Sequence, residues 1–251
     1  MKNKFSFFWT ALILTFLCSC EGEPQTHTFG ELVIYSFQAG MCRVYLIKHK
    51  NIGYLIDTGS PGQQNRILEK MHQAGVDSLA MIILTHGHFD HYGSARALRD
   101  STGASIAIHR ADAQYMAEGK TPLPRTKTWG ILGKLFLPVA EMIYSPESTS
   151  ADILLEDKQN LSTMGLNATI MHTPGHTPGS ICIMLQDSLA FVGDLISARP
   201  TNHVQKYYAF DWEHVRKSFY RLKKSNPSIA FPGHGNHPLS KDDIQKLRPN
   251  Y

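Results

Sequence analysis

Residues 81–91 read Met-Ile-Ile-Leu-Thr-His-Gly-His-Phe-Asp-His. The first four residues form a short apolar run, which is typical of a buried strand. Directly after it, three imidazoles and one carboxylate fall within six residues, namely His86, His88, Asp90 and His91. Histidine nitrogen and aspartate oxygen are good zinc ligands, at about 2.0–2.2 Å. A solvated loop that happens to be rich in histidine is the alternative, but it does not explain four ligand-type residues at one strand end.

Three later segments show a similar arrangement. In each, an apolar run is followed by a glycine and a ligand-type side chain next to it. Residues 173–180 (TPGHTPGS) place His176 in a loop rich in proline and glycine, residues 191–194 end in Asp194, and residues 231–235 contain His234. Taken alone, Asp194 would be interpreted as a helix N-cap. Strand ends that a sheet brings side by side can form one cleft, which is where function usually lies.

In their order along the chain, these seven residues resemble the motif set of the metallo-β-lactamase superfamily, most closely its glyoxalase II-like branch, over about residues 31–247. The resemblance implies a single α/β domain, an αββα sandwich with a two-metal site at one edge of its two sheets. By the family pattern one metal is held by His86, His88 and His176. The second is held by Asp90, His91 and His234, and Asp194 bridges both.

The resemblance also implies a cofactor and a reaction. Two Zn²⁺ ions are expected, with iron or manganese as alternatives, and the partner is a small-molecule substrate. Two divalent ions roughly 3.5–4 Å apart can share a water and lower its pKa, which supplies a metal-bridging hydroxide as nucleophile. Asp90 is the expected catalytic residue, because a carboxylate beside this water can accept its proton. The predicted reaction is hydrolysis of an ester-type bond, with a thioester or lactone favoured over a lactam or phosphoester.

Two departures from the family pattern narrow the range of expected substrates. Only 17 residues follow His234, which is too few for the helical domain that grips glutathione in glyoxalase II enzymes. Zinc β-lactamases mostly lack an acidic residue at the bridging position, where this chain has Asp194, so a dedicated β-lactamase is disfavoured. Three alternatives stay open: a sulfur dioxygenase with one iron, a weak β-lactamase, and a non-catalytic binding protein that kept the fold.

The N-terminus resembles an export signal. Lys2 and Lys4 precede 14 uncharged residues, 5–18, fewer than the roughly 20 that a membrane-spanning helix needs. The sequence Leu-Cys-Ser-Cys at 17–20 resembles the bacterial lipoprotein box, which implies cleavage before Cys20 and a lipid on its thiol. We therefore predict a signal peptide at 1–19, a tether at 20–30 and one domain at 31–251, anchored in the bacterial cell envelope. An ordinary secretory signal or an uncut anchor is the alternative.

Composition excludes other classes. The net charge of +4 comes from 25 Lys and Arg against 21 Asp and Glu, without the basic stripe that a nucleic-acid partner would need. Four cysteines are too few for a disulfide scaffold, and Cys42 and Cys182 are expected as small buried hydrophobes. Residues 119–150, with four prolines and an apolar centre, are predicted as an insertion or lid.

Several further residues have weaker assignments. Asp57, before Thr58 and Gly59, either orients a ligating imidazole or forms a turn. Tyr207 and Tyr208 are candidates for contact with an oxyanion. Four other histidines are not expected to be ligands: His109, His172, His203 and His237.

The periodicity predicts alternating strands and helices. Strands are expected at 32–37, 42–47, 54–56, 81–84, 105–108, 153–155, 168–171, 181–185, 189–192 and 230–231. Helices are expected at 63–74, 90–100, 110–117, 211–224 and 242–247.

Overall fold

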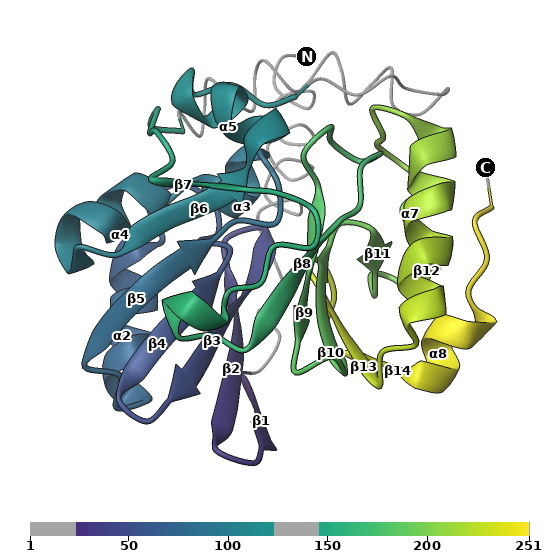
Figure 1. The fold of residues 1–251 in the computed structure, drawn as a ribbon. Coiled ribbons are helices and arrows are strands. Elements are labelled where there is room, and N and C mark those ends of the chain that lie inside the picture. The colour runs from purple at the N-terminus through teal and green to yellow at the C-terminus, as the bar shows by residue number, and fades with distance from the viewer. Residues whose placement is uncertain (1–23, 123–145, 251) are drawn as a thin grey trace, which may run out of the picture.

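The computed structural model describes residues 24–122 and 146–250. Two β-sheets lie face to face (Figure 1). The larger has seven strands side by side in chain order: β1 (Gln25–Phe29), β2 (Leu32–Ala39), β3 (Cys42–His49), β4 (Ile52–Ile56), β5 (Ser78–Ile83), β6 (Ser105–His109) and β7 (Ile153–Leu155). The smaller has the order β14 (Leu239–Ser240), β13 (Ile229–Pro232), β10 (Leu189–Gly193), β9 (Ile181–Leu185) and β8 (Ala168–His172). A short ribbon joins β11 (Ile196–Ser197) to β12 (His203–Val204).

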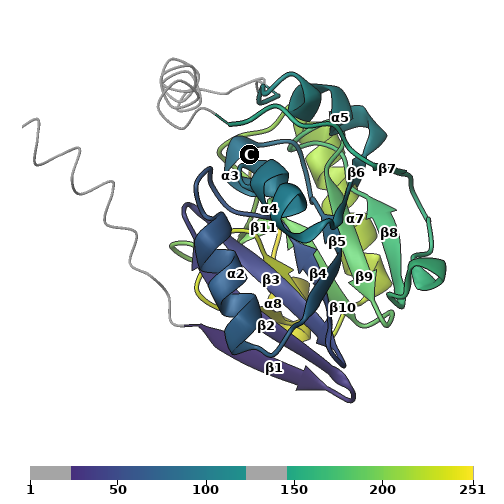
Figure 2. The same cartoon turned by 90° about the vertical axis from the view of Figure 1, so that its left-hand side faces the viewer.

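Helices cover the outer face of each sheet, as Figure 2 shows for α2 and α4. The larger sheet carries α2 (Gln64–Gln73), α3 (Phe89–Tyr92), α4 (Ala95–Thr102) and α5 (Arg110–Ala117). The smaller sheet carries α7 (Trp212–Ser225) and α8 (Lys241–Lys246), and a 3-10 turn, η1 (Ser162–Met164), precedes β8. Among the described residues, no helix has both the length and the apolar character needed to cross a bilayer.

Three apolar layers hold these elements together, because the central strands are buried on both faces. In β3, Val44 and Leu46 pack towards the helices, whereas Tyr45 and Ile47 pack between the sheets. In the smaller sheet, Cys182 lies in the layer below α7 and α8 while its neighbour Ile183 lies between the sheets. The predicted αββα sandwich is therefore confirmed.

The helix predicted at 90–100 is wrong in one respect, since it is two helices. Gly93 N–H donates to Gly59 O at 3.0 Å, and the Ser94 hydroxyl donates to Ser60 O at 2.8 Å. These two residues bind the loop that follows β4, so the helix is interrupted between α3 and α4.

The predicted tether at 20–30 also needs correction, because β1 occupies Gln25–Phe29 and pairs antiparallel with β2. The signal peptide at 1–19 and Cys20 lie outside the described residues. So does most of the predicted insertion at 119–150, of which the structure describes 119–122 and 146–150.

Candidate metal centre

All seven predicted ligands lie at one end of the sandwich, on loops that follow strands. β5 leads into His86 and His88, and α3 begins directly after His88 and presents Asp90 and His91. His176 lies in the loop between β8 and β9, Asp194 follows β10, and His234 follows β13. Their ligand atoms form two groups, each within 4.8 Å: His86, His88, His176 and Asp194, and then Asp90, His91 and His234.

Asp194 lies between the two groups and contacts both. Its Oδ1 is 3.3 Å from His91 Nε2. Its Oδ2 is 3.3 Å from His176 Nε2 and 3.4 Å from His234 Nε2. Asp90 completes the second group, with Oδ2 3.4 Å from His234 Nε2. A carboxylate shared in this way is placed to bridge two cations.

Four imidazoles in the cluster are held through Nδ1 by an acceptor outside it. The pairs are His86 with Thr85 Oγ1 (3.0 Å), His91 with Asp57 Oδ2 (2.8 Å), His176 with Tyr208 O (2.8 Å) and His234 with Met41 O (3.1 Å). A carboxylate or carbonyl oxygen can only accept, and the Thr85 hydroxyl already donates to Asp57. Each Nδ1 therefore carries the proton, and each Nε2 lone pair faces the cluster.

These lone pairs and the carboxylate oxygens are crowded together, and the side chains that carry them are buried or half-buried. His86 Nε2 is buried without a hydrogen-bond partner among the described residues, and His91 Nε2 lies 3.4 Å from His234 Nε2. Lone pairs this close repel each other unless a cation or proton lies between them. Neutral imidazoles and carboxylates are also the donor set that zinc prefers. The residues therefore fit divalent metal ions.

The electrostatics differ between the two groups. In the second group, burial acts to lower the pKa of His91 and of His234, but nearby acidic groups outweigh it and raise both pKa values, so a positive charge is favoured there. Burial, followed by the neighbouring imidazoles, lowers the pKa of His86 and of His88 well below the usual range. Both imidazoles are then neutral at pH 7, as metal ligands must be. Burial acts to raise the pKa of Asp194, but His234, His91 and His176 outweigh it and lower that pKa well below its usual range. Asp194 is therefore an anion.

Asp57 meets both of its predicted descriptions. It has a positive φ of 59°, as a turn residue before glycine can have, and it also holds a ligating imidazole. Its Oδ1 accepts from the backbone N–H of Thr85 at 2.8 Å, and its Oδ2 accepts from the Thr85 hydroxyl and from His91. Asp57 thus joins the end of β4 to the metal loop that follows β5.

Sequence reasoning missed two buried residues beside the site. Asp112 in α5 accepts hydrogen bonds from residues next to His86, His88 and His176. Gln205 donates to Asp194 O at 3.2 Å and accepts from the backbone N–H of Tyr207 at 3.0 Å. In the sequence, Asp112 is only an acidic residue in a helix's first turn, so no local signal identified it.

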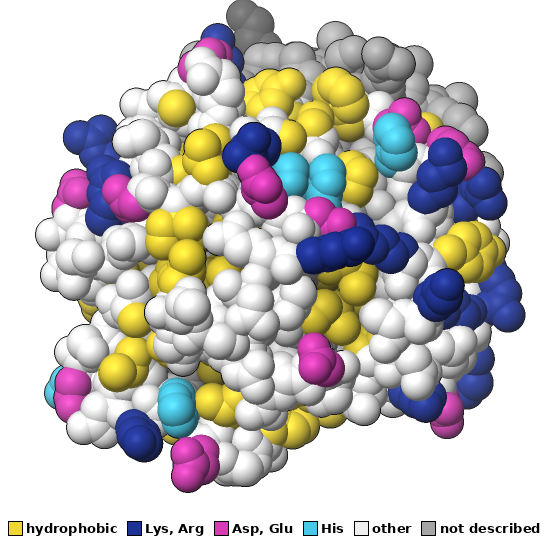
Figure 3. All heavy atoms as spheres, in the orientation of Figure 1, with side chains coloured by type: hydrophobic (Ala, Val, Ile, Leu, Met, Phe, Trp, Pro, Cys, Tyr) yellow, Lys and Arg dark blue, Asp and Glu magenta, His cyan; other side chains and the backbone are white. Residues whose placement is uncertain are grey.

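The histidines set aside in the sequence are not members of either group. His109 and His172 stack with ring centroids 3.9 Å apart, near the ion pairs of Arg110 with Glu156 and Arg221 with Asp157. Figure 3 shows two histidine side chains side by side among acidic and basic ones on this face. His203 packs against Tyr207, and His237 is bound to Asn202. Cys42 and Cys182 are buried and free, as expected.

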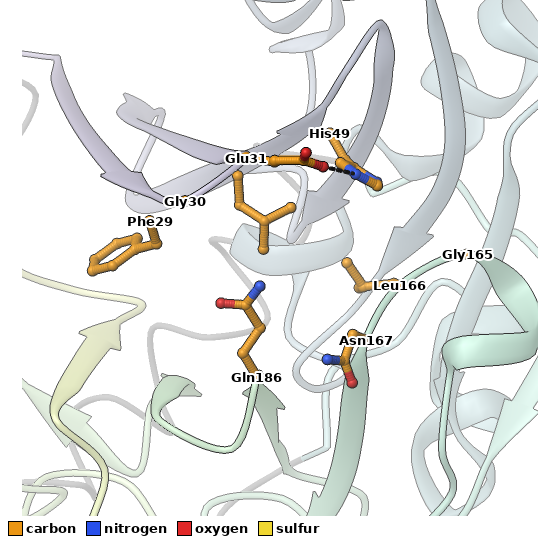
Figure 4. Close-up of a pocket in the computed structure, with 9 residues that line it drawn as sticks. Phe29, Gly30, Glu31, His49, Gly165, Leu166, Asn167 and Gln186 are labelled. Carbon is orange, nitrogen blue, oxygen red and sulfur yellow. Dashed lines mark hydrogen bonds and ion pairs between the residues drawn. The ribbon is translucent and has the colours of Figure 1, made fainter.

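A cavity of about 510 Å³ lies at the opposite end of the sandwich, next to the β1–β2 and β9–β10 turns (Figure 4). Among its lining residues, His49 Nε2 lies 3.4 Å from Glu31 Oε2. Neither residue is a member of either ligand group.

Known proteins share this fold. A family model described as the metallo-beta-lactamase superfamily matches residues 38–234. A relative in Methanocaldococcus jannaschii, named a probable metallo-hydrolase, is 28% identical over 201 residues, which cover 76% of this chain and 85% of that protein. BLEG-1 B3 metallo-β-lactamase has a TM-score of 0.65 at 20% identity, with 83% of this chain and 93% of that one covered. TTHA1623, solved in a di-iron-bound form, has a TM-score of 0.59 at 21% identity, with 83% and 94% covered. The chain belongs to the metallo-β-lactamase superfamily.

Proposed function

We propose that this protein is a dinuclear zinc hydrolase of an ester-type bond, with a thioester or a lactone as substrate. The broader class, a metal-dependent hydrolase, follows from the superfamily. The observation that carries the proposal is the set of four Nδ1 hydrogen bonds, which turn four Nε2 lone pairs towards one bridging carboxylate. His86, His88 and His176 would hold one ion, Asp90, His91 and His234 the other, and Asp194 both.

Bound divalent ions supply a water of lowered pKa and a Lewis acid for a carbonyl oxygen. The residues around them position this chemistry. Asp90 Oδ2 faces the second group and is placed to accept a proton from an attacking water. Asp57 keeps the His91 proton on Nδ1, so that its Nε2 stays a ligand.

A protein nucleophile is not needed, and the cysteine near the site is unsuited to be one. Cys42 is fully buried, and burial together with Asp57 and other nearby carboxylates raises the pKa of its thiol well above the usual value, although His91 opposes the shift. The thiol is therefore protonated at pH 7 and is a poor nucleophile.

Two measurements on the purified protein test this function. Metal analysis should find two zinc ions per chain, and a panel of thioester, lactone, β-lactam and phosphodiester substrates should show turnover of an ester-type member. Asp90→Ala and His88→Ala should lower kcat at least a hundredfold, as expected for a group used in the chemical step. His237→Ala, an exposed histidine outside both groups, is the matched control and should keep full activity.

Other outcomes would replace the proposal. One iron per chain with oxygen uptake would make the protein a sulfur dioxygenase. Turnover that persists in Asp90→Ala after the metal content is lost would exclude a metal mechanism. β-Lactam turnover faster than that of every ester would make it a β-lactamase.

We also propose that the hydrolase is lipid-anchored in the bacterial cell envelope through Cys20. The lipoprotein-like sequence at 17–20 supports this. Radiolabelled fatty acid should be incorporated into the full chain, and Cys20→Ser should abolish that label and move the protein out of the membrane fraction. Equal labelling of the Cys20→Ser variant would exclude the anchor.

A further inference from the structure

Asp112 is a buried carboxylate that belongs to neither ligand group and has no role in the proposed reaction. Its side chain is fully buried on the first turn of α5. Oδ2 accepts from the backbone N–H of Gly87 at 2.8 Å and from the Thr177 hydroxyl at 2.6 Å. Oδ1 accepts from the backbone N–H of Gly179 at 2.6 Å.

The three donors belong to the two loops that carry the first metal group. Gly87 lies between His86 and His88, and Thr177 and Gly179 follow His176. These loops belong to different sheets, since one follows β5 and the other joins β8 to β9. One carboxylate therefore connects two loops whose ends are also joined by one backbone hydrogen bond, from Ile181 N–H to Thr85 O at 2.9 Å.

The packing around this carboxylate leaves little freedom. A Cβ at Gly179 would lie 2.6–2.7 Å from the carboxylate and backbone nitrogen of Asp112, so only glycine allows this approach. The Thr177 hydroxyl also lies 2.7 Å from Ser180 Oγ, which ties the second loop to itself. The contacts with Asp112 therefore restrict how the two loops can lie relative to each other.

We propose that Asp112 is a positioning residue that fixes the spacing of the His86–His88 loop and the His176 loop, and so sets the affinity of the first metal site. Asp57 has the equivalent place beside the second group, where it holds His91. Each half of the centre then has its own buried aspartate. The inference rests on the proposed metal centre, but it is tested by metal affinity rather than by turnover.

The test is a zinc titration of folded, zinc-free protein in competition with a chromophoric chelator. Asp112→Asn keeps the size of the side chain but places an amide NH₂ against N–H and O–H donors. The Asp112→Asn substitution should weaken the zinc-binding step assigned to the first site by about 10- to 100-fold, as for other residues that orient ligands. Thr177→Val should weaken the same step, and Thr177→Ser should restore it.

Asp152→Asn is the matched control. Asp152 accepts a hydrogen bond from the backbone N–H of Ile106 at 2.8 Å, which binds β6 at a point outside the ligand loops. The Asp152→Asn substitution should lower the stability of the zinc-free protein without changing either zinc affinity. This result would separate the positioning of ligands from general stability.

Each result has a definite meaning. Unchanged zinc affinity in both Asp112→Asn and Thr177→Val would overturn the inference, and so would an equal loss in Asp152→Asn. If Asp112→Asn does not fold, the two Thr177 variants decide. Failure of the unsubstituted protein to bind zinc would instead overturn the proposed function.

Discussion

The Asp57 carboxylate accepts a hydrogen bond from His91 Nδ1 at 2.8 Å, and neither side chain is more than 2% exposed. The same carboxylate binds the backbone N–H and the hydroxyl of Thr85, the residue before the metal loop. One buried charge therefore fixes both the proton of a ligating imidazole and the end of the strand that carries it.

Replacing this charge should weaken the second metal site. In Asp57→Asn the amide has one oxygen for three donors, and the positive φ at this position suits asparagine. We expect a fall in second-site zinc affinity of about 10- to 100-fold and a loss of about 1–3 kcal/mol in the free energy of unfolding of the zinc-free protein. Zinc titration and urea denaturation measure the two effects. Asp187→Asn, in the β9–β10 turn at the other end, should change neither, and an unaltered zinc affinity in Asp57→Asn would contradict the role.

Removing the metal should destabilise the fold as a whole, because each group takes ligands from both sheets. An ion present at 100 to 1,000 times its Kd adds about 3–4 kcal/mol to the free energy of unfolding. The midpoint of urea denaturation should therefore fall after chelation and recover with zinc. Magnesium, which prefers octahedral oxygen ligands, should not restore it. Equal midpoints with and without zinc would show that the cluster is not a metal site.

We expect Tyr207 and Tyr208 to contact the substrate. They are 44% and 42% exposed, and the loop they lie on holds His176 through Tyr208 O. Tyr208→Ser keeps the carbonyl but removes the ring, so KM should rise by about tenfold, equivalent to 1.4 kcal/mol of contact, while kcat stays within about twofold. Tyr220 on α7 is 43% exposed, and Tyr220→Ser is the matched control that should leave KM unchanged. An unchanged KM in both Tyr208→Ser and Tyr207→Ser would show that the substrate binds elsewhere.

His109 should make the fold sensitive to acid. Burial, and then the His172 ring and Arg110, lower the pKa of His109 to about 4, whereas an unfolded chain protonates it near pH 6.5. Between these values the unfolded state binds more protons, so stability is complete above about pH 6.5 and falls towards pH 4. His109→Asn keeps a side-chain acceptor for the α5 N-terminus and removes the titration.

The comparison is between two buffers, about pH 7.5 and about pH 5. Over this interval the unsubstituted protein should lose about 2 kcal/mol more of its free energy of unfolding than His109→Asn. His49→Asn, which removes an exposed histidine at the far end of the sandwich, should behave as the unsubstituted protein does. An identical acid loss in all three proteins would show that His109 does not titrate in this way.

Much of the fold could be predicted from the sequence, because its strands are buried on both faces and appear as continuous apolar runs, as in β5, β9 and β10. β1 was missed, since its sequence, QTHTF, is polar and only half buried. The break between α3 and α4 was missed because it depends on hydrogen bonds to residues 59–60, more than 30 positions earlier.

The seven clustered side chains were predictable because each follows a strand end with a glycine beside it or nearby. Asp112 was not, because its three donors lie 25, 65 and 67 positions away. Met41 and Tyr208 were not predictable as supports of His234 and His176 either, since they act through backbone carbonyls. Every residue has a backbone carbonyl, so the identity of a residue does not indicate that its carbonyl accepts such a hydrogen bond.

The division of both ligand groups between the two sheets has a consequence for the order of events during synthesis. His86 to His91 leave the ribosome early, but the first group is incomplete without Asp194 and the second without His234, which follows β13. Neither half of the sandwich holds a full ligand set, so an ion is retained only by a chain that is almost entirely made and packed. Metal capture would then come last in assembly, since a chain stalled partway has no complete ligand set for either ion.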